Sequence, residues 1–147
     1  MARRKTLATA PAAEPTVVTV TVDIADLITE KLNELSGIEI ARDAWDQKAP
    51  EQYGVTTLSL EPTVQYADGH LIDEIYTTTL DLYVNNSADD WPALVREKLD
   101  ELEAANGWMD LICRMTLREY VFDIDKVHWQ FQIQTTGPLI RTVTIAG

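Results

Sequence analysis

The chain has 147 residues, of which 46% are hydrophobic and 24% charged, a composition typical of one soluble globular domain. It carries 12 Lys and Arg against 24 Asp and Glu, and three of the basic residues are Arg3, Arg4 and Lys5. Residues 16–147 therefore hold 9 basic and 23 acidic residues, a net charge of −14. This balance argues against binding of polyanions by the body of the protein. The single cysteine, Cys113, excludes an internal disulfide and a multi-cysteine zinc site.

Residues 1–22 are expected to form an N-terminal arm. Residues 1–15 are rich in Ala and Pro and lack a hydrophobic pattern, whereas residues 16–22 are almost all β-branched and predict an extended strand. Such a strand is either flexible or exchanged with a neighbouring subunit, which makes Val17, Val18 and Val20 candidate interface residues.

An amphipathic helix is predicted over residues 24–35, with Asp23 as its N-cap and Gly37 in the left-handed conformation beyond its last turn. A short strand at residues 38–41 and a polar loop at residues 43–52 follow. Residues 55–60 predict the next strand.

The Asp68-Gly69 pair indicates a hairpin between residues 63–66 and 71–75, because such turns need positive φ angles. Residues 76–84 alternate and predict a longer strand.

A second amphipathic helix is expected to begin near Ser87, whose hydroxyl can cap it, and to end at Asn106-Gly107. Its apolar stripe comprises Trp91, Leu94, Val95, Leu99, Leu102 and Ala105. Two strands are predicted next, at residues 111–120 and 126–134. We expect Cys113, Met115 and Leu117 to share a buried face, and Trp108 to join the core.

The order of these elements predicts an α+β fold, an antiparallel sheet with two helices packed on one face. Residues 23–138 would form this single domain, and residues 139–147 a C-terminal tail.

No catalytic constellation is visible, so we expect no enzyme and no metal or other cofactor. His70 lies in the predicted turn with acidic neighbours, and His128 lies on the polar face of a strand without an evident nucleophile. The sequence has no P-loop, GxSxG, HExxH or CxxC motif, and no apolar run long enough to cross a membrane. Two sites are candidates for protein contacts: the aromatic residues Trp45 and Tyr53, which we expect to lie in a polar loop, and the Asp68-Gly69-His70 turn.

Several segments together resemble the tail terminator, or tail completion, proteins of long-tailed bacteriophages. They are the helix ending at Leu35-Ser36-Gly37, the loop with Tyr53, the strand at residues 75–84, the Asn85-Asn86-Ser87 turn with its helix, and the strand around His128-Trp129-Gln130. The resemblance covers residues 23–136 and depends on element order rather than on a fixed motif.

This resemblance implies a structural virion protein, assembled in the host cytoplasm, that forms a homohexameric ring on the head-proximal end of the tail tube. Its partners would be itself, the major tail tube protein and a head-completion or connector protein. DNA would pass through the ring without specific binding.

Three alternative functions are compatible with the sequence. The first is another neck or tail ring component, such as a head-completion or tube protein, and the second is a non-viral protein-binding module. The third is an enzyme that uses His70 or His128.

Overall fold

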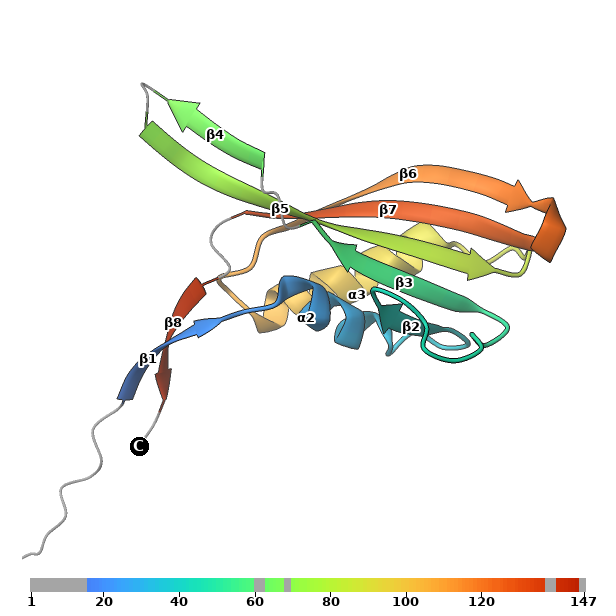
Figure 1. The fold of residues 1–147 in the computed structure, drawn as a ribbon, viewed down its shortest axis with the longest axis horizontal. Helices are drawn as coiled ribbons and strands as arrows, with labels where there is room; N and C mark the ends of the chain where they lie inside the picture. The colour runs from blue at the N-terminus through green and yellow to red at the C-terminus, as the bar shows by residue number, and fades with distance from the viewer. Residues whose placement is uncertain (1–15, 60–62, 68–69, 137–139, 146–147) are drawn as a thin grey trace, which may run out of the picture. The chain divides into compact units, whose positions relative to one another are not determined.

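A computed structural model describes residues 16–59, 63–67, 70–136 and 140–145, with side chains over residues 22–59 and 75–136. The chain divides into two compact units (Figure 1). The larger is Asp23–Gly137, and the smaller contains strands β1 and β8. The larger unit has an α+β fold with a mixed, mostly antiparallel sheet, as the sequence predicted.

The larger unit contains two helices, a short 3₁₀ helix and six strands within the described residues. In chain order they are α2 (Ile24–Leu32), β2 (Glu39–Arg42), β3 (Tyr53–Leu58), β4 (Thr63–Ala67), β5 (His70–Val84), α3 (Trp91–Ala105), β6 (Leu111–Val121), η1 (Phe122–Ile124) and β7 (Lys126–Thr136).

The sheet has the strand order β2-β3-β5-β7-β6, and β4 pairs with the first part of β5. All pairs are antiparallel except β2 with β3, which run parallel and correct the purely antiparallel prediction. The two predicted runs at residues 71–75 and 76–84 form one strand of 15 residues, β5. Its first part pairs with β4, and its last part lies between β3 and β7.

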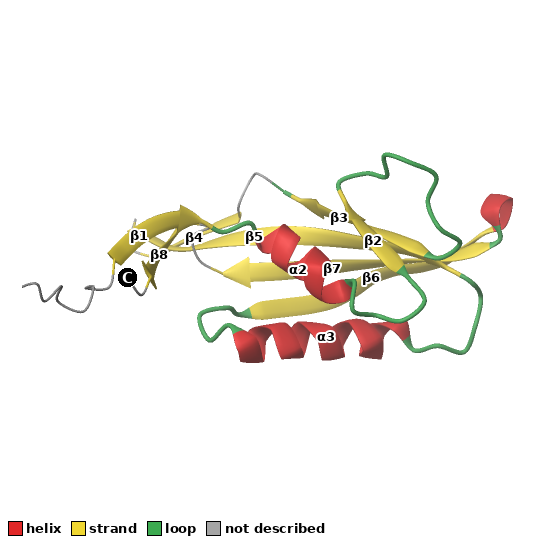
Figure 2. Ribbon diagram, turned by 90° about the horizontal axis from the view of Figure 1, so that it is seen from below, coloured by secondary structure: helices red, strands yellow, loops and turns green. Residues whose placement is uncertain are grey.

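Both helices lie on the same side of this sheet (Figure 2). Alternate strand residues face them and are almost completely buried, as strand periodicity requires. The fully buried strand residues on this side include Leu80, Leu82, Phe131 and Ile133, and the helices contribute Ile24, Ile28, Leu32, Val95 and Leu99. This layer is the hydrophobic core.

Helix α2 begins where the sequence predicted but ends earlier. The Asp23 carboxylate accepts a hydrogen bond from the main-chain N–H of Asp26 (3.1 Å), as an N-cap does. The helix stops at Leu32 because the Asn33 side chain bonds both the N–H and the C=O of Ile40, at 2.8 and 2.9 Å. Gly37 adopts the predicted left-handed conformation, with φ of +79°.

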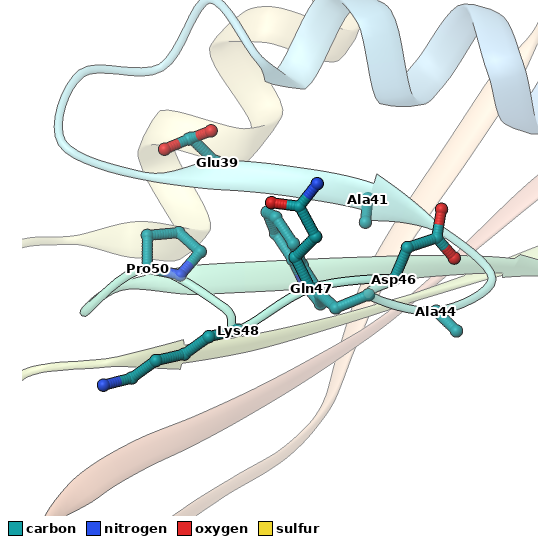
Figure 3. A pocket seen from close by; sticks show the side chains of 8 residues that line it. Glu39, Ala41, Ala44, Asp46, Gln47, Lys48 and Pro50 are labelled. Atoms are coloured by element: carbon teal, nitrogen blue, oxygen red, sulfur yellow. The ribbon is translucent and has the colours of Figure 1, made fainter.

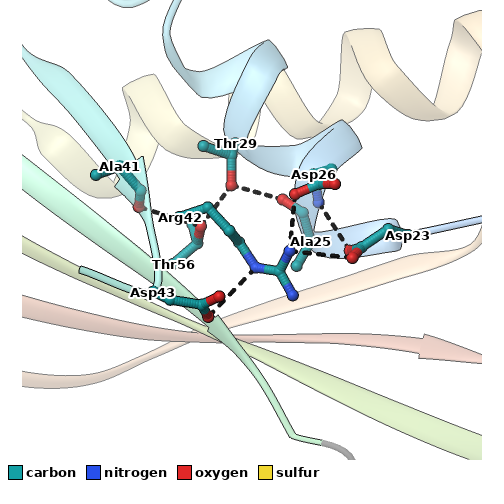
Figure 4. Close-up of polar contacts among 8 residues, drawn as sticks. All are labelled: Asp23, Ala25, Asp26, Thr29, Ala41, Arg42, Asp43 and Thr56. Carbon is teal, nitrogen blue, oxygen red and sulfur yellow. Dashed lines mark hydrogen bonds and ion pairs between the residues drawn. The ribbon is translucent and has the colours of Figure 1, made fainter. Parts of the chain in front are cut away.

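Two polar links attach α2 to the strands beneath it (Figure 4). The Arg42 guanidinium lies 3.0 Å from the Asp23 carboxylate and 2.7 Å from that of Asp26. Deeper in the structure, the Thr29 hydroxyl donates to the Ala25 carbonyl (2.5 Å) and is hydrogen-bonded to the Thr56 hydroxyl of β3. Buried polar groups need such partners, so these contacts fix the position of the helix on the sheet.

Helix α3 begins at Trp91, with Asp90 rather than Ser87 as its N-cap. The Asp90 carboxylate accepts from the N–H of Ala93 (3.3 Å), which places Pro92 in the first turn where no N–H is needed. The Ser87 hydroxyl instead donates to Asp89 (2.9 Å). The Ser87 cap predicted from sequence was therefore three residues too early.

Strand β6 is less buried than its hydrophobic residues predicted. Leu111 is buried and Cys113 half-buried, but Met115 is 45% exposed and the nearby Trp108 is 39% exposed. The cause is twofold: β6 is an edge strand, and its register with β7 shifts between Met115 and Leu117. This β-bulge breaks the alternation on which the predicted common face of Cys113, Met115 and Leu117 depended.

The smaller unit is a two-stranded antiparallel ribbon. Strand β1 (Thr16–Thr21) pairs with β8 (Ile140–Ile145), with Thr16 opposite Ile145 and Thr21 opposite Ile140. The predicted strand near residues 16–22 is thus present. The sequence predicts a separate N-terminal arm and C-terminal tail, whereas in the structure the strands of these two segments pair.

Candidate functional site

One side of the sheet carries polar and aromatic side chains and is covered by neither helix. We define this open face by Thr79, Asp81 and Tyr83 of β5 together with their β7 partners Gln132, Gln130 and His128. All six are half-buried. They alternate with the buried core residues of the same strands, so the open face follows directly from the period of two.

An aromatic row crosses three strands of the open face. Tyr53 of β3 lies opposite Tyr83 of β5, which lies opposite His128 of β7. The Tyr53 and Tyr83 rings are stacked at 5.1 Å between centroids, and the Tyr83 and His128 rings at 4.5 Å. Trp45 meets Tyr53 edge-on at 6.4 Å and continues the row onto the β2–β3 loop. Such cross-strand pairs stabilise sheet register.

Carboxylates hold the histidine of this row. His128 Nε2 lies 2.7 Å from Asp81 Oδ1, and its Nδ1 lies 3.5 Å from a Glu119 oxygen. Asp81 also accepts a hydrogen bond from the Gln130 amide (3.0 Å). Burial, followed by the negative charge of Asp81, raises the pKa of Tyr83. The side chains of the row are thus fixed in orientation rather than free to move.

The imidazole–carboxylate pair could orient a general base, but a catalytic site also needs a nucleophile or an activated water. Within the described side chains, no hydroxyl or thiol is hydrogen-bonded to His128. The same part of the chain contains no group of three His, Cys, Asp or Glu residues that could hold a metal ion. The arrangement provides rigid stacking and hydrogen-bonding groups, which are features of a contact surface.

A hollow of about 480 Å³ adjoins the aromatic row, between β2 and the loop at residues 43–52 (Figure 3). Its lining includes Glu39 and Ala41 of β2 and Trp45, Lys48 and Pro50 of the loop. The Trp45 indole N–H donates to the carbonyl of Gly54 (3.2 Å), which fixes the loop against β3. The hollow mixes apolar walls with charges of both signs.

The structure brings together two of the predicted interface residues, Trp45 and Tyr53. His70 is the first residue of β5 and pairs with Ala67, but its side chain lies outside the described residues. Asp68 and Gly69, like the basic residues Arg3, Arg4 and Lys5, also lie outside them.

The predicted arm residues Val17, Val18 and Val20 all belong to β1. They pair with Thr144, Val143 and Arg141 of β8, and their side chains are not described.

Tyr83 and Asp81 are not among the site residues predicted from the sequence, and His128 has no partner in that prediction. The alternation of apolar and polar residues in β5 and in β7 is visible in the sequence, but the register between these two strands is not. A one-residue shift between β5 and β7 would have placed different residues together.

The sequence matches no known protein family, and no curated protein matches it. Neither helix of the described chain is long and apolar enough to cross a membrane.

Proposed function

We propose that this protein is a structural tail terminator of a long-tailed bacteriophage. In this role it forms a homohexameric ring on the head-proximal end of the tail tube, ends tube growth and offers a surface to a head-completion or connector protein. The proposal includes assembly in the host cytoplasm and a final location in the virion. It extends the resemblance of residues 23–136 to this family.

The observation that carries the proposal is the amount of strand edge available for contact with other subunits. Strands β2 and β6 end the sheet of the larger unit, and the β1–β8 ribbon is a separate unit with its own edges. Each strand of a two-stranded ribbon pairs on one side only, so its other side can pair with a further strand. Edges of this kind favour assembly by strand addition.

The charge of the body supports passage of DNA through such a ring. Residues 16–147 have a net charge of −14, which repels a polyanion. We expect a variant lacking residues 1–15 to show no binding to duplex DNA at physiological salt. Salt-sensitive binding by this variant in a fluorescence anisotropy titration would contradict this part of the proposal.

Light scattering of the purified protein across concentration and salt, followed by electron microscopy, tests the ring. The like charge of the subunits opposes assembly at low salt, so we expect closed rings to increase as salt screens it. Tail tubes of the same phage, added to the protein, should acquire a cap and stop growing. A protein that stays monomeric even with tube ends, or that grows into open tubes, would refute the proposal.

The proposed role requires no catalysis. His128→Ala and His70→Ala variants that remain folded should therefore still form rings and cap tubes. Loss of function in a stably folded His128→Ala variant, together with a reaction that depends on this residue, would favour the enzyme alternative instead.

A further inference from the structure

Two side chains of α3 cover the first half of the free edge of β6. Glu103 Oε2 accepts from the N–H of Leu111 (3.0 Å), and the Arg96 guanidinium donates to the carbonyl of Cys113 (3.2 Å). These side chains occupy main-chain groups that another strand would need. Coverage of this kind protects a sheet edge from pairing.

The second half of β6 lacks this cover. The bulge at Thr116, whose hydroxyl donates to the Gln130 carbonyl (3.3 Å), separates the two halves. Beyond it, no described side chain hydrogen-bonds to the main chain of residues 117–121. This stretch, which we call the open edge, has room for a strand of about five residues.

Exposed apolar side chains accompany the open edge. The described chain has seven large hydrophobic residues that are exposed, and three of them, Tyr120, Phe122 and Ile124, lie on the open edge or in the turn that directly follows it. Ile112 and Met115, also exposed, lie on the covered half of β6. Phe122 is 83% exposed. The turn that carries it is nevertheless ordered, because the Tyr120 hydroxyl donates to Asp125 and the N–H of Asp125 bonds the Phe122 carbonyl (3.3 Å). A fixed, exposed aromatic residue is a typical anchor for a protein contact.

We propose that the open edge accepts β1 from a second copy of this chain, in antiparallel orientation. This inference depends on the proposed function and assigns the lateral contact of the ring. Strand β1 has six residues, all Thr or Val, and therefore matches the open edge in length and carries no charge. Strand β8, the other strand of the ribbon, contains Arg141 and would add a second positive charge to an edge that already carries Arg118.

Charge complementarity selects the antiparallel direction. Strand β6 runs toward the turn that contains Asp123 and Asp125, with Glu119 shortly before it. An antiparallel β1 would direct the preceding residues past this acidic turn. Those residues, 1–15, carry Arg3, Arg4 and Lys5 against Glu14 alone, so their net charge is +2. A parallel β1 would direct them away from it.

The same contact is heterologous, because it joins β1 of one copy to β6 of the next. Contacts of this type form a closed ring when the rotation between copies divides a full turn. The arrangement would continue the sheet from β7 and β6 of one subunit into the ribbon of its neighbour.

Photo-cross-linking tests this pairing without assuming a register. The full-length protein would carry a benzophenone amino acid at position 18, and assembled samples would mix isotopically light and heavy subunits. We expect cross-links between light and heavy chains that map to residues 117–125. A benzophenone at position 97, on the exposed side of α3, is the matched control and should give at least about tenfold fewer cross-links to this region.

Side-chain variants provide a second measurement. Phe122→Ser should weaken association at least about tenfold, the loss expected when a large apolar contact is removed from an interface. Ile112→Ser, an exposed residue on the covered half of the same strand, should leave association unchanged. Both variants should fold, since each side chain is largely exposed, and circular dichroism checks this.

The outcomes separate this inference from the proposed function. Rings that form and cross-link from position 18 to other residues, or only within one chain, would overturn the β1–β6 pairing and leave the terminator proposal standing. Equal effects of Phe122→Ser and Ile112→Ser would also overturn it. A protein that stays monomeric under all conditions would overturn both.

Discussion

The two sides of the sheet use the same strands for different purposes. On the helix side, Leu80 and Phe131 are at most 1% exposed and pack in an apolar layer. One residue further along each strand, Asp81 and Gln132 belong to the open face and are only half-buried. The helix side therefore provides most of the free energy of folding through burial, whereas the open face provides fixed polar and aromatic groups.

This difference indicates where the protein can change without unfolding. Substitutions on the open face remove contacts that are individually small, such as the stacking of Tyr83 on His128. Substitutions on the helix side leave cavities or clashes in a close-packed layer. Amino-acid substitutions on the open face should therefore change the contact surface without unfolding the protein.

The largest contrast is expected within β7. Phe131→Ala should reduce the free energy of unfolding by about 3–5 kcal/mol, because Phe131 is 1% exposed and its removal leaves a cavity. Gln132→Ala, on the adjacent residue of the open face, should cost about 0.5 kcal/mol or less. Urea denaturation of both variants under monomeric conditions measures the difference. Similar losses would mean that the two faces are not energetically distinct.

A smaller loss is expected at Gly54 of β3. A Cβ atom there would lie 2.8 Å from Leu82 Cδ2 and 3.1 Å from the main-chain carbonyl of Asp81. The side chain can move, but the carbonyl belongs to the neighbouring strand, so Gly54→Ala should destabilise the fold by about 1–3 kcal/mol. Gly107→Ala is the control, since nothing lies within 4 Å of its Cβ position. A neutral Gly54→Ala variant would show that β3 and β5 separate easily.

Thr56→Val tests the buried polar link between the helix side of β3 and α2. The substitution removes the hydroxyl that bonds Thr29 and that lies 3.5 Å from the Ala41 carbonyl, but Thr29 still donates to the Ala25 carbonyl. The expected loss is therefore about 1 kcal/mol, because the contact with Ala41 is long and no donor is orphaned. Thr57→Val, an exposed position on the same strand, should change stability by less. A loss above about 3 kcal/mol would indicate that Thr56 organises more than its contacts with Thr29 and Ala41.

Local features of the fold could be predicted from the sequence. The start of α2 at Asp23, the left-handed Gly37 and the alternation of β7 each depend on residues close together in the chain. Strand β1 was predicted from the β-branched residues of its own short segment. Its pairing with β8 was not, because it joins the two ends of the chain.

The candidate site was only partly predictable because it depends on register between distant strands. Trp45 and Tyr53 were noticed as aromatic residues near a loop, but the row through Tyr83 and His128 requires β3, β5 and β7 to align at one level. The bulge at Thr116 has no sequence signal of its own, so the exposure of Met115 was missed. The amino-acid composition of a strand does not determine its register with a neighbouring strand.

The smallest predicted effect is a change in alkaline stability caused by Tyr83 of the open face. Burial raises the pKa of its phenol above the ordinary value of about 10. As pH rises past that value, the unfolded chain loses the proton first and the folded chain keeps it. The folded state then binds more protons, so the contribution of Tyr83 is complete below about pH 10 and is lost as pH rises toward its folded pKa.

Tyr83→Phe removes this titration, so the variant should lose stability less steeply than the parent protein above about pH 10. Urea denaturation at a series of pH values measures the slope. Tyr120→Phe is an informative comparison, because the pKa of Tyr120 is raised first by its hydrogen bond to Asp125 and the residue is exposed. Added salt screens exposed charges, so it should diminish the effect of Tyr120→Phe more than that of Tyr83→Phe. Identical slopes for Tyr83→Phe and the parent would show that the Tyr83 phenol is as well solvated in the folded protein as in the unfolded chain.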